Sequence, residues 1–204
     1  MSNKLRGMAG AVVALALFAS PSVASQSVDL SNPAFAQVTG PTSIPVGAAE
    51  FCKSHRDECM PSAHVVDIET LSQAGWEQLV SINNQVNSSI VPETDENLYR
   101  VNEYWTYPNG SGDCEDFALE KRRQLIANGW DASALLMTVV RQRNGEGHAV
   151  LMVRTDRGDL VLDNQDGRVL VWSDTPYEFI KRQSQINPGK WVGLADTRVI
   201  LASN

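Results

Sequence analysis

Long basic runs, glycine, proline, cysteine and histidine are all sparse in this 204-residue chain. Lysine and arginine total 17 against 24 aspartates and glutamates, for a formal charge of −7. Because the basic residues nowhere gather into a stripe that could follow a phosphate backbone, we expect no nucleic-acid partner. Glycine and proline are too few for a fibrous protein, and a hydrophobic share of 43% is too high for a mostly disordered one. The length fits one ordinary globular domain.

Only one segment, at the amino terminus, is apolar enough to suggest a membrane, and it is short. Lys4 and Arg6 precede an apolar run over residues 7–19, and small residues follow, with Ala24 placed for cleavage. Since a bilayer span needs about 20 apolar residues, the pattern predicts a secretory signal over residues 1–24. The alternative is an uncleaved membrane anchor. We therefore expect an exported mature protein with no membrane span.

Export changes the interpretation of the three cysteines. Cys52 and Cys59 lie seven positions apart in a polar segment. In an oxidising compartment such a pair is expected to form a disulfide, although two free thiols remain the alternative. Cys114 is then unpaired, which in an exported protein calls for an explanation.

The rest of the chain has helical patterns first and strand patterns afterwards. Residues 25–47 show no clear periodicity and predict a flexible lead-in to a single domain over residues 48–204. A helix is expected from Thr70, where the spacing of a capping box begins, to Ile90. Pro92 ends that pattern.

A second helix is expected over residues 113–128, with Gly129 as its stop. Its predicted buried face comprises Phe117, Ala118, Leu125 and Ile126. Short β-branched runs then predict four strands, over residues 134–141, 148–154, 159–163 and 169–172, before a closing helix over residues 177–185. Helices followed by a meander of strands are typical of an α+β domain.

Three residues in this layout could carry chemistry. Cys114 falls in the first turn of the second helix, where free N–H groups and the helix dipole favour a thiolate. If a two-residue turn at Asp156-Arg157 joins the second and third strands, His148 and Asp163 project from one face, one diagonal step apart. That step is about 7–8 Å between backbones, which an imidazole and a carboxylate can bridge. The sequence thus permits a nucleophile, a base and an orienting carboxylate in one line.

The motifs around these residues resemble those of the bacterial transglutaminase-like cysteine peptidases, a group that includes the LapG-type periplasmic adhesin proteases. The motifs are Gly112-Asp-Cys-Glu-Asp-Phe117, Gly147-His-Ala149 and Leu162-Asp-Asn164, in this order. The resemblance implies a papain-like/transglutaminase-like core with N-terminal helices packed on an antiparallel β-sheet. It also implies Cys114 as nucleophile, His148 as base and Asp163 as its orienter. Family members carry a spaced cysteine pair upstream, which suits Cys52 and Cys59.

Three carboxylates lie within one turn of Cys114, from Asp113, Glu115 and Asp116. Acidic residues at a helix start ordinarily complement the dipole, which is the plain alternative. Like charges nearby also raise the pKa of a thiol, and a bound hard cation would remove that conflict. Clustered carboxylates suit calcium. The LapG-type proteases depend on calcium through the acidic residues that flank the cysteine, which here implies Asp113 and Glu115.

These observations predict a periplasmic thiol protease that cleaves a peptide bond in a periplasmic or surface protein through an acyl-enzyme on Cys114. The resemblance implies a large surface adhesin as substrate and an inner-membrane receptor as a regulatory partner. Three alternatives stay open. They are acyl transfer to an amine, a cell-wall amidase, and a non-catalytic binding module in which Cys114 is only a buried structural thiol.

Overall fold

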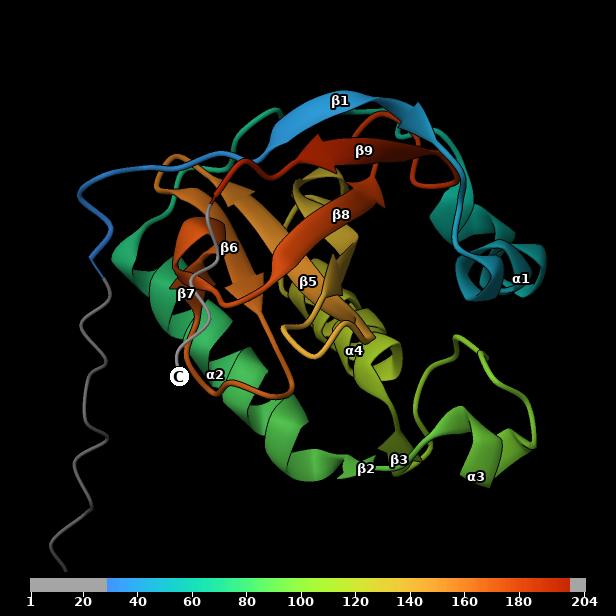
Figure 1. The fold of residues 1–204 in the computed structure, drawn as a ribbon. Helices are drawn as coiled ribbons and strands as arrows, with labels where there is room; N and C mark the ends of the chain where they lie inside the picture. The colour runs from blue at the N-terminus through green and yellow to red at the C-terminus, as the bar shows by residue number, and fades with distance from the viewer. Residues whose placement is uncertain (1–28, 199–204) are drawn as a thin grey trace, which may run out of the picture.

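An antiparallel sheet of seven strands organises residues 29–198, the part of the chain that this computed structural model describes (Figure 1). The strands follow the order β1-β9-β8-β4-β5-β6-β7. They are β1 (Gln37–Thr42), β4 (Leu135–Arg141), β5 (Gly147–Thr155), β6 (Gly158–Leu162), β7 (Leu170–Val171), β8 (Glu178–Gln183) and β9 (Trp191–Ala195). A separate parallel pair joins β2 (Val91–Pro92) to β3 (Ser111–Gly112). The predicted secretory signal, residues 1–24, lies outside the described residues.

Two long helices cover one face of this sheet (Figure 1). Helix α4 packs directly against β4 and β5, and α2 packs against α4. The helices are α1 (Val46–Ser54), α2 (Gln73–Ser89), α3 (Asp95–Tyr99) and α4 (Cys114–Ala127), with short 3-10 turns η1 (Arg56–Cys59), η2 (Ala132–Ala134) and η3 (Trp172–Asp174). This arrangement confirms the predicted α+β class. None of the helices in residues 29–198 has the length and hydropathy to span a bilayer.

The β5–β6 hairpin has the register that the sequence predicts. Thr155 pairs with Gly158 and Leu151 pairs with Leu162, on either side of a two-residue turn. Gly158 adopts a φ of 105°, a conformation that favours glycine. Because side chains alternate between faces along a strand, this register fixes which residues of β5 and β6 share the helix-covered face.

Both long helices form where the sequence predicts them, with small differences at their ends. Helix α4 begins at Cys114 after Asp113 at the N-cap, as expected. Helix α2 begins at Gln73 rather than at Thr70, because the Ser72 hydroxyl accepts the Gly75 N–H and caps it there. The predicted buried face of α4 holds for Phe117, Ala118 and Leu125 but is wrong for Ile126, which is 37% exposed.

Two predictions about the sheet are wrong. The segment predicted as a helix over residues 177–185 instead contains strand β8 (Glu178–Gln183), which lies between β9 and β4. The strand buries Arg182 and Gln183, whose polarity hides the alternation that usually marks a strand. Residues 37–47 are not an irregular lead-in, because they form the edge strand β1 and the start of α1. Strand β1 is largely exposed on both faces, so its sequence has no apolar period.

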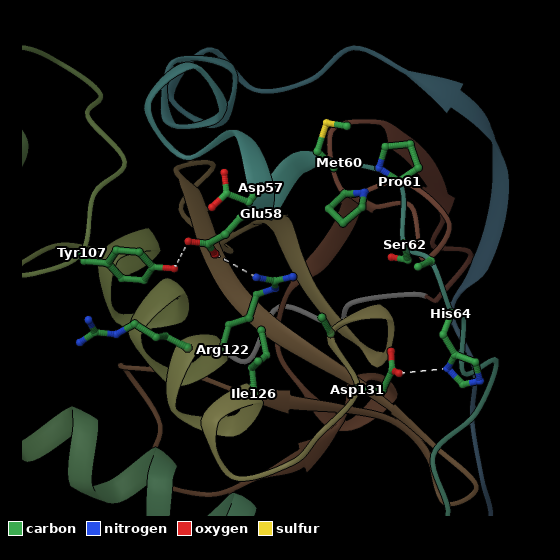
Figure 2. A pocket seen from close by; sticks show the side chains of 14 residues that line it. Asp57, Glu58, Met60, Pro61, Ser62, His64, Tyr107, Arg122, Ile126 and Asp131 are labelled. Atoms are coloured by element: carbon green, nitrogen blue, oxygen red, sulfur yellow. Dashed lines mark hydrogen bonds and ion pairs between the residues drawn. The ribbon is translucent and has the colours of Figure 1, made fainter.

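Cys52 and Cys59 form the predicted disulfide, with their Cα atoms 5.6 Å apart. The bond ties the end of α1 to η1, which carries Glu58. The Glu58 carboxylate accepts hydrogen bonds from the Tyr107 hydroxyl at 2.5 Å and from Arg122 of α4 at 3.2 Å (Figure 2). Since the Arg122 side chain is 5% exposed, the disulfide loop supplies the carboxylate for a buried guanidinium.

Replacing both Cys52 and Cys59 by serine should lower the free energy of unfolding. Releasing so short a loop costs about 2 to 3 kcal/mol, and weaker placement of Glu58 adds to this loss. Urea unfolding measures the change. A reductant should destabilise the wild type and Cys114→Ser by the same amount and leave the double variant unaffected. A double variant as stable as the wild type would contradict this role for the disulfide.

Candidate active site

Cys114 is half-buried at the first residue of α4, in contact with strand β5. Its Sγ accepts the backbone N–H of Ala149 at 3.4 Å. The thiol donates to the Glu115 carboxylate at 3.2 Å. Ala149 directly follows His148, so the helix start and the start of β5 bring the predicted nucleophile and base into one region.

His148 and Asp163 form a buried pair beside this thiol. Nε2 of His148 lies 2.9 Å from Oδ1 of Asp163, and the two side chains are 1% and 4% exposed. Asp163 also accepts the backbone N–H of Gln165 at 2.9 Å and the hydroxyl of Tyr177 at 2.5 Å. Burial alone would raise the pKa of Asp163, but the hydrogen bonds from His148, Gln165 and Tyr177 hold it below its ordinary value. The carboxylate is therefore ionised and accepts the Nε2 proton of the imidazole.

Tyr177 and Gln165 belong to this region although the sequence analysis did not name them. The Tyr177 ring centre lies 5.3 Å from that of His148. Tyr177 falls in the segment predicted as a helix, which concealed its position directly before strand β8. Gln165 follows Asp163 by two residues, a spacing at which a carboxylate commonly accepts a backbone N–H.

The surroundings of Cys114 oppose a thiolate. Burial raises the pKa of the thiol, and the Glu115 and Asp113 carboxylates raise it further, whereas the N–H of Ala149 lowers it. The net direction is upward, so the expected stabilisation of a thiolate by the helix start is outweighed.

Asp95, Asp113 and Asp116 form an acidic cluster in which one carboxylate oxygen of each lies within 4.8 Å of the others. An oxygen of each residue is buried without a hydrogen-bond partner. Burial, together with the neighbouring carboxylates, raises the pKa of Asp95 to about 6 and that of Asp116 to about 7. Unpartnered, crowded carboxylate oxygens are the donor set of a hard cation such as calcium or magnesium.

The predicted metal ligands are thus only partly brought together. Asp113 and Asp116 lie in the cluster, since residues three apart share a helix face, whereas Glu115 is directed to the Cys114 thiol. Burial and the contact with Asp113 raise the pKa of Glu115 to about 10. Asp95 of α3 is the third carboxylate of the acidic cluster. No local spacing could have indicated Asp95, because the loop between α3 and α4 brings it there.

A separate hollow of about 570 Å³ lies between η1, the segment after it and α4 (Figure 2). Two charged pairs lie in it, since Glu58 binds Arg122 and Asp131 lies 3.3 Å from His64. Cys114 and His148 are not among its lining residues. The side chain of His64 is 78% exposed. We therefore place the reactive groups at the start of α4 and not in this hollow.

Comparisons with known proteins show what the chain as a whole is similar to. A family described as "bacterial transglutaminase-like cysteine proteinase BTLCP" matches residues 38–199. The calcium-bound structure of Legionella pneumophila LapG is 28% identical, covers 60% of this chain and 70% of its own, and has a TM-score of 0.50. The EGTA-treated LapG structure is 28% identical, covers 60% and 68%, and has a TM-score of 0.48. No curated protein matches the chain.

The acidic cluster predicts a pH-dependent stability in metal-free buffer. Asp116 titrates near pH 7 when folded and near 3.8 when unfolded, so between these values the folded protein holds the extra proton. Its contribution to the free energy of unfolding therefore falls as pH rises through that interval, by about 1.4 kcal/mol for each pH unit. Relative to the wild type, Asp116→Asn should gain stability steadily from pH 4 to pH 7.

Urea unfolding with chelator present measures this difference at each pH. The exposed Glu96→Gln provides the matched control, and its difference from the wild type should stay constant. If the free energies of unfolding of Asp116→Asn and the wild type changed with pH in parallel, ionisation of Asp116 would not destabilise the folded protein.

Proposed function

The chain belongs to the bacterial transglutaminase-like cysteine proteinases, a family of cysteine peptidases, and we propose that Cys114, His148 and Asp163 are its catalytic triad. One observation carries the assignment: a buried imidazole–carboxylate pair lies at the start of β5, where the next residue, Ala149, donates to the Cys114 sulfur. Neither of the other histidines offers this. His64 is solvated, and His55 stacks on Phe51 with ring centres 4.2 Å apart.

In this mechanism Nδ1 of His148 is the atom that accepts the thiol proton. Asp163 holds the Nε2 proton of His148, which leaves the lone pair of the neutral ring on Nδ1. Nδ1 takes the proton of the Cys114 thiol, and the sulfur electron pair forms a bond to the carbonyl carbon of the substrate. His148 therefore acts as a general base during the attack.

The start of α4 supplies the second requirement, a site for the developing oxyanion. The first N–H groups of a helix have no partners within the helix, and that of Cys114 lies beside the attacking sulfur. The imidazolium then protonates the leaving amine, and the peptide bond breaks to give a thioester on Cys114. Water, deprotonated by His148, hydrolyses the thioester and restores the thiol.

We further propose that the cluster of Asp95, Asp113 and Asp116 holds calcium. The unpartnered oxygens of these residues fit a hard cation, and the similar LapG structure is calcium-bound. A bound cation supplies positive charge beside Cys114 and offsets the carboxylates that oppose a thiolate. The chain itself contributes the fixed positions of the three carboxylates, two of which accept the backbone N–H groups of Tyr104 and Thr106.

The proposed substrate is a polypeptide in the periplasm or at the cell surface, and a large adhesin is the leading candidate. This part of the proposal rests on the predicted export signal and on the resemblance to the LapG-type proteases. An inner-membrane receptor that sequesters the enzyme is proposed on the same basis.

Alkylation of Cys114 by iodoacetamide tests the triad, because Cys114 is the one thiol outside the disulfide. At neutral pH the reaction should slow by about tenfold or more in His148→Ala, since loss of a general base commonly costs 10² or more. His64→Ala is the matched control and should react like the wild type. Alkylation that is slow in the wild type and no slower in His148→Ala would favour a non-catalytic binding module.

The calcium proposal predicts which carboxylates bind the ion. Calcium added to the metal-free wild type should raise the melting temperature, by an amount equivalent to about 2.7 kcal/mol at one hundred times Kd. Asp95→Asn should lose most of this gain, whereas Glu115→Gln should keep it. Calorimetry in chelator-treated buffer measures both. The reverse pattern would restore Glu115 as a ligand and remove Asp95.

A further inference from the structure

The imidazole of His148 is buried by side chains that lie outside the proposed triad. Its side chain is 1% exposed, although a general base must meet the thiol and the substrate. Tyr177 lies against one part of the ring, and Asp163 binds Nε2. The remaining nitrogen, Nδ1, lies 3.4 Å from the side-chain amide nitrogen of Gln165, a residue that is itself exposed.

The direction of this contact follows from the other side of the ring. Asp163 is ionised and can only accept, so Nε2 of His148 carries the proton. A ring with its one proton on Nε2 has its lone pair on Nδ1, and the Gln165 amide donates to it. In the same structure the Cys114 thiol donates to Glu115. Nucleophile and base therefore each have another partner, and the lone pair needed for the reaction is occupied.

We propose that Gln165 is a positioning residue whose side-chain amide occupies Nδ1 of His148 in the resting enzyme, so that this hydrogen bond must break before the base can act. The proposal rests on the proposed triad and concerns the regulation of that same site. Breaking the contact transfers no atoms, and the thiol proton then moves from Sγ to Nδ1 as described above. Because Gln165 is exposed, an entering polypeptide can displace its side chain.

The backbone of Gln165 has a separate role, which makes the side chain testable by itself. The Gln165 N–H donates to Asp163 whatever the side chain, so a substitution leaves the carboxylate held. Methionine has nearly the shape of glutamine and no donor. Gln165→Met therefore removes the hydrogen bond to Nδ1 while the cover over His148 is kept.

The experiment measures iodoacetamide alkylation of Cys114 in the purified protein at neutral pH. Gln165→Met should accelerate the reaction about two- to tenfold, the effect of freeing one hydrogen bond of ordinary net strength. In the His148→Ala background the same substitution should have no effect, because no base remains to be freed. Nitrogen NMR of ring-labelled histidine should show the Nδ1 resonance of His148 moving downfield in Gln165→Met, as expected for loss of an accepted hydrogen bond.

Arg168→Met is the matched control in the same loop, since Arg168 is exposed and its guanidinium binds Asp166. It should leave both the alkylation rate and the Nδ1 resonance unchanged. An unchanged or slower rate in Gln165→Met, while His148→Ala slows alkylation, would overturn the role of Gln165 and keep the triad. Acceleration that persists without His148 would mean only that Gln165 shields the sulfur. An alkylation rate that is the same in His148→Ala as in the wild type would instead overturn the proposed function.

Discussion

The hydrogen bond between His148 and Asp163 depends on one register, and the arrangement of the site depends on that bond. The turn that pairs Thr155 with Gly158 sets which residues of β5 and β6 share a face. A slip by one residue would send the two side chains to opposite sides of the sheet. Because α4 packs against β5, the same strand that presents His148 also presents the Ala149 N–H to Cys114. Sheet register and helix packing thus position three residues that are distant in the chain.

Charge at the start of α4 poses the main energetic problem of this fold. Asp95 and Asp116 are almost wholly buried, and each has an oxygen without a partner. Burying an unpaired carboxylate costs several kcal/mol, which is why the pKa values of these groups rise instead. A structure that keeps such groups together beside a nucleophile sacrifices stability in the metal-free state. A divalent cation would turn this local cost into binding energy and would couple the integrity of the site to the ion.

Local patterns were sufficient for much of the architecture. The boundaries of α4 follow from its capping residues and from Gly129, and the His148–Asp163 pairing follows from the parity of a hairpin with a two-residue turn. The third acidic residue, Asp95, could not be inferred, because its place beside Asp116 depends on the path of a long loop. Strand β8 was misread for a different reason. Tertiary contacts, including the approach of Arg182 to the Met152 sulfur at 3.6 Å, allow polar residues to be buried in a central strand.

The misread segment also contacts the proposed triad. Tyr177 precedes β8 and donates to Oδ2 of Asp163, whereas His148 binds Oδ1. A carboxylate that stays ionised while almost fully buried needs several donors. For Asp163 one donor is the nearby Gln165 N–H, and the others, His148 and Tyr177, come from other segments. Polar residues that interrupt a simple hydrophobic period are therefore expected around such a group. Where the apolar pattern fails in a buried element, the explanation should first be sought in the chemistry that the element supports.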